Sequence, residues 1–370
     1  MRLRTFFLTI FLAVGFGYGA DAPPIRVLIA EVAGPVTVPM AGPHRGFVDD
    51  NLAFSTLTAL AWPLSSVAGK IVVDGQAVGH SFTLEPTDGT FVSWEGRPYR
   101  GALRFVATGA SLEVINVVDL ESYLRGVVPA EVPASWPTEA LKAQAVAART
   151  YTLASLQSGE NYDVCATTEC QKYGGAAAEH PRSDAAISAT SGIVLTYYGT
   201  FAKTYYHADS GGVLASSAEV WGDVRPYLVA RQDVPSTTPH RSWQKQLNGA
   251  VIQASLSELG LDIGGVQVLQ ISGYSESGRV SSVVVVGATG STTLSGPSLT
   301  KLLRTWGLKS TRFSMTGALS AQGDGWGHGV GMSQYGANAL ASANYDYSQI
   351  LAFYYPTTDL QTLTYAATTP

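Results

Sequence analysis

The sequence contains few cysteines, few charged residues and no apolar run of membrane-spanning length. Only two of its 370 residues are cysteines, and neither lies near the N-terminus, which excludes a lipid-modified N-terminal cysteine. Charged residues make up 14% of the chain and the net charge is −5, without a basic stripe beyond the N-terminal segment, so electrostatic binding to nucleic acid is not expected. The 46% hydrophobic content and the lack of repeats or low-complexity tracts indicate a soluble, folded body.

The N-terminal segment predicts export. Arg2 and Arg4 precede an apolar stretch over residues 6–16, and small residues follow up to Ala20. This arrangement resembles a secretory signal over residues 1–22. Because several cleavage positions compete, an uncleaved N-terminal anchor stays open, although the apolar stretch is short for a bilayer span. We therefore expect the mature protein to be secreted, periplasmic or associated with the cell envelope.

Short apolar runs bounded by glycine, proline and serine predict an α+β fold with a β-rich core of short strands and hairpins. The predicted strands lie within residues 25–32, 70–75, 90–96, 99–107, 112–118, 192–199, 200–208, 266–275 and 279–288. One long helix is predicted over residues 138–156, and shorter helices over 180–190, 255–259, 296–303 and 332–341. Residues 23–365 are expected to form one main domain. A smaller β/α subdomain is predicted as an insertion within residues 240–320, after the proline-containing segment 233–239.

The most informative segment runs from residue 119 to residue 151. Glu131 lies between Pro129 and Pro133, whose fixed φ angles predict a stiff turn that aims the carboxylate. Ser135 is a candidate N-cap, with Pro137 in the first turn of the long helix.

On that long helix, Lys142 and Arg149 lie seven residues apart and are expected to share one face. A different face is expected to pack against the rest of the protein, and it consists of Leu141, Ala145, Ala148 and Thr152. The alternative is that both cations are ordinary solvated helix charges and that Glu131 is a surface acid.

A second constellation is the glycine-rich segment 323–337, in which Trp326 and His328 alternate with glycines before Gln334 and Tyr335 begin a helix. Glycine at this density permits positive φ angles and a close backbone approach to a ligand, so a carbohydrate groove is one interpretation. A tight loop with a packed tryptophan is the other.

Residues 204–212 read as a strand that ends in a glycine turn and carry Tyr206, His207 and Ser210. A serine hydrolase is disfavoured, because no G-x-S-x-G elbow occurs.

Several motifs together resemble the SpoIID/LytB family, the stage II sporulation protein D and amidase-enhancer group. In order along the chain, they are LESYLRGVVPAEVP followed by EALKAQAVAARTY, then CATTECQKYGG, TSGIVLTYYG, TYYHADSGG, EVWG and GWGHGVGMSQYGA. The resemblance extends over residues 25–359, which is almost the whole mature chain.

The resemblance implies a peptidoglycan lytic transglycosylase that cleaves glycan strands lacking stem peptides, with Glu131 as its single acid and base. The sugar's own 6-hydroxyl would attack the anomeric carbon and leave a 1,6-anhydromuramoyl end, so a second carboxylate is not needed. The candidates for substrate binding are Lys142, Arg149, Tyr206, His207, Ser210, His328, Gln334 and Tyr335. The alternatives are a non-catalytic murein-binding module that enhances a cell-wall amidase, and a structural envelope protein without glycan binding.

For Glu131 to act as an acid near neutral pH, its pKa has to lie above the usual carboxyl range. Apolar neighbours such as Val127, Val128 and Val132 are expected to raise this pKa, whereas a nearby cation would lower it. We therefore expect Lys142 and Arg149 to orient substrate or to stabilise the fold at some distance from Glu131.

The two cysteines, Cys165 and Cys170, are separated by four residues. The resemblance brings in zinc, because some relatives carry histidines beside these cysteines, but this chain has Glu169 there and no histidine between the pair. In an exported protein a local disulfide is the favoured state, with zinc binding and free thiols as alternatives. No cofactor is otherwise expected.

Overall fold

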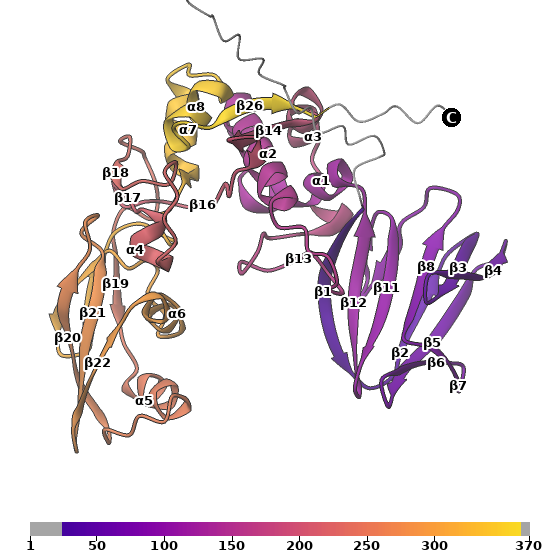
Figure 1. Cartoon of the computed structure of the whole chain (residues 1–370), viewed down its shortest axis with the longest axis horizontal. Helices are drawn as coiled ribbons and strands as arrows, with labels where there is room; N and C mark the ends of the chain where they lie inside the picture. The colour runs from indigo at the N-terminus through magenta and orange to yellow at the C-terminus, as the bar shows by residue number, and fades with distance from the viewer. Residues whose placement is uncertain (1–23, 364–370) are drawn as a thin grey trace, which may run out of the picture.

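The computed structural model describes residues 24–363, so the predicted signal segment 1–22 lies outside the described residues. Figure 1 shows the N-terminal sheets on one side, helices α1, α2, α3, α7 and α8 in the middle, and the elements from β19 to β22 with α5 and α6 on the other side. The architecture is α+β and rich in strands, which confirms the predicted fold class. No helix within residues 24–363 is long and apolar enough to cross a membrane.

The N-terminal part consists of the strands that precede the first helix, together with β13, which follows the second helix. A seven-stranded sheet has the order β13-β1-β12-β11-β8-β3-β4, and a four-stranded sheet has the order β2-β5-β6-β7. Their strands, with the β9–β10 hairpin, are β1 Ile25–Ala33, β2 Val36–Met40, β3 His44–Val48, β4 Asn51–Thr56, β5 Leu60–Val67, β6 Lys70–Val73, β7 Gln76–Gly79, β8 Ser81–Pro86, β9 Val92–Trp94, β10 Arg97–Tyr99, β11 Ala102–Thr108, β12 Ser111–Val118 and β13 Val164–Cys165.

The pairing in the larger sheet brings the ends of its strands to the first helix. Strands β1 and β12 are antiparallel, with Ile25 opposite Val118, so β12 ends where the helices begin. Strand β13 pairs with β1 in parallel, with Val27 opposite Val164. This pairing anchors the segment that carries both cysteines beside the sheet.

The segment before the long helix is itself helical, which corrects the predicted proline-bounded turn. Helix α1, Leu120–Glu131, includes Pro129 in its last turn and ends at Glu131 itself. Asp119 caps its first turn by accepting from Ser122 N–H at 2.9 Å. The buried positions recur at helical spacing: Leu120, Tyr123, Leu124, Val127 and Val128. Packing of this apolar stripe overrides the preference of the residue before proline for extended backbone.

Helix α2, Thr138–Leu153, does not have one cationic and one packed face. Pro137 takes the N-cap position without a side-chain cap, so Ser135 is not the N-cap. Residues such as Leu141 and Ala145 belong to the core under the N-terminal sheets, whereas Ala143 and Ala147 belong to a second core against α7 and α8. The helix is therefore buried between two cores, because its alanines allow close approach on both sides.

The second core lies around the other helices and several short strands. These elements are η1 Gly175–Ala178, α3 Pro181–Ala189, β14 Ile193–Tyr197, β15 Thr200–Phe201, β16 Tyr206–His207, β17 Val213–Leu214, α4 Ser217–Trp221, β18 Arg231–Gln232, β25 Met332–Ser333, α7 Gln334–Ser342, α8 Tyr347–Tyr354 and β26 Asp359–Thr362. Helices α3 and α7 confirm two of the predicted helices, and α4 and α8 were not predicted. The parallel pairing of β16 with β25 joins residues far apart in the sequence, since His207 lies opposite Ser333.

The segment predicted to contain an inserted subdomain has a hydrophobic core of its own, built from residues between Trp243 and Ala321. Its elements are β19 Trp243–Gln246, α5 Gly249–Glu258, β20 Val266–Tyr274, β21 Val280–Gly287, β22 Ser291–Ser295, α6 Pro297–Thr305, β23 Phe313–Gly317 and β24 Ser320–Gly323. Helix α5 begins earlier than predicted, because Asn248 caps it by accepting from Ala250 N–H. Two three-stranded sheets, β20-β21-β22 and β19-β24-β23, form this side of the molecule.

Candidate active site

Glu131 lies at the C-terminal end of α1 and its carboxyl is contacted by two donors. Oε1 accepts a hydrogen bond from Lys172 N–H at 2.6 Å, and Gln334 Nε2 lies 3.4 Å from Oε2. Burial raises the pKa of Glu131, while the Lys172 amide and charge and the Gln334 amide act to lower that pKa. The net direction is upward, as the apolar surroundings predict.

The segment that presents Lys172 follows directly after a disulfide. Cys165 and Cys170 are joined, with Cα atoms 5.4 Å apart, which is the favoured state predicted for this pair. Within residues 24–363, no group of three or more His, Cys, Asp or Glu side chains is arranged to hold a metal ion. The bridge closes the loop immediately before Gln171 and Lys172.

Gln171 ties this loop to the helices behind the carboxyl. Its Nε2 donates to Thr152 Oγ1 at 2.9 Å and to the Tyr123 hydroxyl at 3.2 Å. Its Oε1 accepts from the Tyr206 hydroxyl at 2.8 Å. Gln171 is 1% exposed, so these bonds hold the backbone that aims the Lys172 amide at Glu131. The sequence pattern did not single out Gln171 or Lys172, although both lie within the CATTECQKYGG motif.

Gln334 reaches Glu131 from the start of α7. Ser333 caps this helix by accepting from Gly336 N–H, which fixes the position of the first turn. The Gln334 amide also lies 3.4 Å from Oε1 of Gln144 on α2. The candidate residue Gln334 is thus brought to Glu131 across 203 positions of sequence.

The two candidate cations lie away from Glu131 in separate ion pairs. Lys142 Nζ lies 2.7 Å from Glu139 Oε1 one turn away on the same helix. Arg149 donates to both carboxylate oxygens of Glu121, at 2.8 and 2.7 Å, and its side chain is 0% exposed. Arg149 therefore stabilises the fold by joining α2 to α1. This placement corrects its assignment as a residue that contacts substrate, because a fully buried side chain cannot reach a polymer.

His207 and Ser210 are buried, with exposed fractions of 5% and 1%. His207 Nδ1 lies 3.1 Å from the Val330 carbonyl, and Ser210 Oγ donates to Asp233 at 2.6 Å. Burial lowers the pKa of His207 well below its ordinary value, so the ring is neutral. Both residues hold the interior together, which corrects their assignment as substrate contacts, and Ser210 donates to a carboxylate instead of a histidine.

Tyr206 and His328 join β16 to the glycine-rich loop. His328 Nε2 lies 3.1 Å from the Tyr206 carbonyl, and its Nδ1 accepts from Val330 N–H at 3.0 Å. Burial lowers the pKa of His328 to about 3, so the imidazole acts as a neutral cross-link. His328 therefore carries no charge at neutral pH.

The glycine-rich loop approaches the protein's own chain closely, which corrects the interpretation that its glycines make room for a ligand. Gly329 has φ +86°, and a Cβ there would lie 2.3 Å from Arg279 Nη2. Gly331 has φ +71°, and a Cβ there would lie 2.1 Å from the Tyr205 carbonyl oxygen. Arg279 is 2% exposed and donates to the Ser210 carbonyl at 2.7 Å. These glycines are needed for packing.

Tyr335, the last candidate, is partly exposed and follows Gln334 on α7. Its ring centroid lies 5.1 Å from that of Trp136 and 5.5 Å from that of His240. Tyr335 is therefore part of an aromatic surface beside the Glu131 carboxyl.

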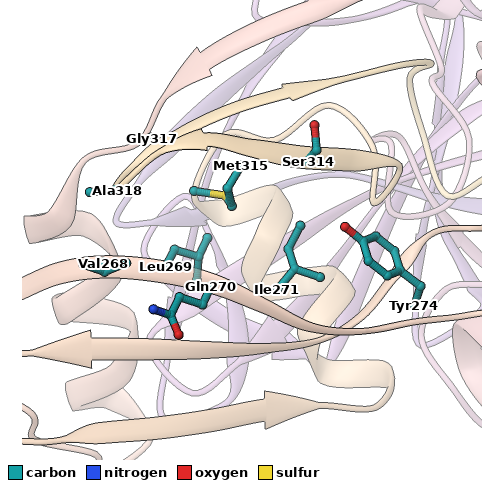
Figure 2. A pocket seen from close by; sticks show the side chains of 9 residues that line it. All are labelled: Val268, Leu269, Gln270, Ile271, Tyr274, Ser314, Met315, Gly317 and Ala318. Carbon is teal, nitrogen blue, oxygen red and sulfur yellow. The ribbon is translucent and has the colours of Figure 1, made fainter.

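A groove on another part of the protein lies away from Glu131. It has a volume of about 520 Å³ and an uncharged lining, and Figure 2 shows it between β20 and β23. Its lining residues are Val268, Leu269, Gln270, Ile271, Tyr274, Ser314, Met315, Gly317 and Ala318. None of the candidate site residues lines this groove.

The protein has an α+β fold, and its candidate site is built around the partly buried carboxyl of Glu131. The loop that follows the disulfide contacts this carboxyl through Lys172 N–H, and helix α7, which follows the glycine-rich loop, contacts it through Gln334. Residues 108–197, which include Glu131, both cysteines and Lys172, match the SpoIID family, described as stage II sporulation protein. The chain belongs to the SpoIID family. Residues 224–331 match a domain family of unknown function, DUF8618.

Three relatives are similar over long stretches. An uncharacterized protein of Brachyspira hyodysenteriae is 28% identical over 347 residues, which cover 91% of this chain and 92% of that protein. The amidase enhancer of Bacillus subtilis is 31% identical over 348 residues, covering 79% of this chain and 49% of that protein. Stage II sporulation protein D of Bacillus subtilis is 28% identical over 268 residues, covering 66% and 75%. The chain thus spans about half the length of the amidase enhancer.

Proposed function

We propose that this protein is an exported peptidoglycan lytic transglycosylase that cleaves glycan strands lacking stem peptides to 1,6-anhydromuramoyl ends. The observation that supports this most is the setting of Glu131, a partly buried carboxyl whose pKa is raised by burial and whose contacts are two amides. The candidate cations do not oppose this shift, because Lys142 pairs with Glu139 and Arg149 with Glu121. Relatives named for sporulation and amidase enhancement support a role at the cell wall.

The two carboxyl oxygens of Glu131 are suited to different tasks. Oε1 accepts the short bond from Lys172 N–H and is therefore the oxygen that stays unprotonated. Oε2 has only the 3.4 Å contact with Gln334, so the acidic proton resides there. A sugar placed against Oε2 receives this proton on its glycosidic oxygen as the bond to the anomeric carbon breaks.

The second half of the reaction uses the same oxygen. Once Oε2 has given up its proton, the carboxylate takes the proton of the sugar's 6-hydroxyl, and that hydroxyl oxygen bonds to the anomeric carbon. The carboxyl ends protonated, as it began, and the product carries an anhydro ring. One acid therefore completes the cycle without a second carboxylate.

The alternative is a non-catalytic murein-binding module that enhances a cell-wall amidase. The 31% identity to a protein named amidase enhancer favours it. Both functions require binding of glycan strands, and they differ in whether Glu131 transfers a proton.

The deciding experiment incubates purified residues 23–370 with peptide-stripped peptidoglycan strands and analyses soluble products by mass spectrometry. The wild-type protein should release anhydromuramoyl ends, and Glu131→Gln should release none, because the amide keeps size and hydrogen bonding but cannot donate the proton. Glu139→Gln is the matched control and should remain active, since Glu139 lies on α2 and pairs there with Lys142. No products from the wild-type protein, with strand binding intact, would reject the transglycosylase in favour of the binding module.

A further inference from the structure

A row of aromatic side chains leads away from Glu131 across the protein surface. It starts at Tyr335, next to Gln334, and continues to His240 in the turn before β19, with ring centroids 5.5 Å apart. His240 in turn lies 4.5 Å from Trp326 of the glycine-rich loop. The Nζ of Lys309 lies 4.9 Å from the Trp326 ring centroid, at the far end of the row. Three separate segments thus contribute to one continuous surface.

Trp326 is the exposed member of this row. Its exposed fraction is 45%, so it is not the packed tryptophan of a tight loop. A single exposed apolar ring is ordinary, but Trp326 continues an aromatic surface with His240 and Tyr335, and contiguous exposed patches of this kind mark binding sites. Tyr335 and His240 are each partly exposed beside it.

The backbone under the exposed ring is rigidly held. Trp326 N–H donates to the Asp209 carbonyl at 2.8 Å, and Asp209 N–H donates to the Trp326 carbonyl at 3.1 Å. On the preceding residue, Gly325 N–H donates to the His240 carbonyl at 3.0 Å, and Gly325 accepts from Trp243 Nε1 at 2.9 Å. The ring is therefore presented on a fixed loop, which reduces the entropy lost when a ligand binds.

The row combines uncharged rings with one cation, which suits a sugar chain that carries carboxylates at intervals. Burial and the nearby Lys309 charge lower the pKa of His240, so its ring is uncharged at neutral pH. Lys309 supplies a cation on an exposed side chain at one end. Sugars match this surface, because their C–H faces stack on aromatic rings and their hydroxyls bond to ring nitrogens and phenols.

We propose that Tyr335, His240 and Trp326 bind successive sugars of a glycan strand beyond the sugar at Glu131, and that Lys309 binds a muramic acid carboxylate at the far end. This inference rests on the proposed function for its choice of polymer. It adds that recognition depends on strand length, because only a strand long enough to pass His240 reaches Trp326. A muramic acid offers Lys309 a free carboxylate only where its stem peptide has been removed.

The test measures binding in a Glu131→Gln background, so that no strand is cut. Peptide-free glycan strands are separated into disaccharides, which are too short to pass His240, and strands of eight or more sugars, and the dissociation constant of each is measured by calorimetry. Adding Trp326→Ala should weaken binding of the long strands about tenfold, equivalent to about 1.4 kcal/mol, and leave the short strands unchanged. Trp326→Phe, which keeps a ring, should restore most of the affinity. Tyr274→Ala is the matched control, because it removes a ring that is 58% exposed on β20. It should change the affinity for neither short nor long strands.

Lys309→Met provides an independent arm. It should weaken long-strand binding and reduce its dependence on salt, because exposed charges are screened by ions. The inference is overturned if Trp326→Ala leaves the affinity for long strands unchanged or lowers the affinity for short and long strands equally. It is also overturned if no strand binds. Should the wild-type protein form no anhydromuramoyl ends while length-dependent binding persists, the transglycosylase is rejected and the aromatic row stands. If the wild-type protein cleaves strands but Trp326→Ala has no effect on binding, the aromatic row is rejected and the transglycosylase stands.

Discussion

Glu131 combines two influences that act on its pKa in opposite directions. Burial disfavours the carboxylate, whereas the 2.6 Å bond from Lys172 N–H favours it, and the net effect raises the pKa above its ordinary value of 4.5. A carboxyl with a raised pKa stabilises the fold at pH values below its ordinary pKa, where it is protonated. That contribution is lost as the pH rises through the folded-state pKa. At neutral pH, therefore, the ionised carboxyl makes the folded state less stable.

Glu131→Gln should consequently be more stable than the wild-type protein at neutral pH. Glutamine keeps the acceptor for Lys172 N–H but carries no charge, so the stability difference should grow as the pH rises from the ordinary carboxyl pKa of 4.5 through the higher folded-state value. Thermal unfolding of both proteins between about pH 4 and about pH 8 measures this difference. A difference that is independent of pH, or a less stable variant at pH 7, would contradict the expected role of burial.

Among the elements, the loop closed by Cys165 and Cys170 has the most direct connection to the site. It positions Gln171 between Tyr123 and Tyr206, and the next amide contacts Glu131. A covalent bridge between the two cysteines holds this segment in place. The loop thus links the oxidation state of two cysteines to the geometry of one carboxyl.

Replacing both cysteines, as Cys165→Ser with Cys170→Ser, should loosen the Lys172 amide and raise the pKa of Glu131 further, because that hydrogen bond lowers it. If the proposed reaction is correct, the alkaline limb of the pH profile of cleavage moves to higher pH while kcat falls. The variant should also lose about 2 kcal/mol of stability, as expected for a short closed loop. Wild-type protein treated with a reductant should behave in the same way, and the variant should not respond to reductant. An unchanged pH profile would show that the bridge does not position the amide.

At the scale of the whole molecule, Arg279 connects the segment around β20 and β21 to the rest of the protein. It precedes β21, and its guanidinium donates to the Ser210 carbonyl and packs against Gly329. Two residues before Arg279, Ser277 N–H donates to Glu219 on α4 at 3.2 Å. This junction also fixes the loop that carries Trp326, so the position of the aromatic row depends on it.

Gly329→Ala should disrupt this junction. A methyl group there would lie 2.3 Å from Arg279 Nη2 on backbone with φ +86°, so both strain and overlap destabilise the fold. Gly34→Ala is the matched control, because Gly34 has φ +97° and no atom within 4 Å of a new Cβ. We expect a loss of roughly 1 kcal/mol for Gly34→Ala and more than about 2 kcal/mol for Gly329→Ala. Chemical denaturation measures both, and equal losses would mean that contact with Arg279 adds nothing.

The sequence by itself determined the features that depend on local pattern. Alternating apolar runs predict strands such as β1, β12 and β21, the alanine-rich composition predicts α2, and the motif around Glu131 indicates the family. Around Glu131 the flanking prolines predict a turn, whereas the structure has helix α1, because the packing of its apolar stripe decides the backbone there.

Only the tertiary structure decided which residues meet Glu131 and which are hidden from solvent. Lys142 and Arg149 look alike in sequence, yet one is partly exposed and the other is fully buried, because α2 lies between two cores. The contact of Gln334 with Glu131 crosses 203 residues, and the Lys172 amide is a backbone group that no side-chain pattern reveals. Periodicity and propensity act between near neighbours in the chain, whereas burial and long-range contacts arise when separate segments pack together.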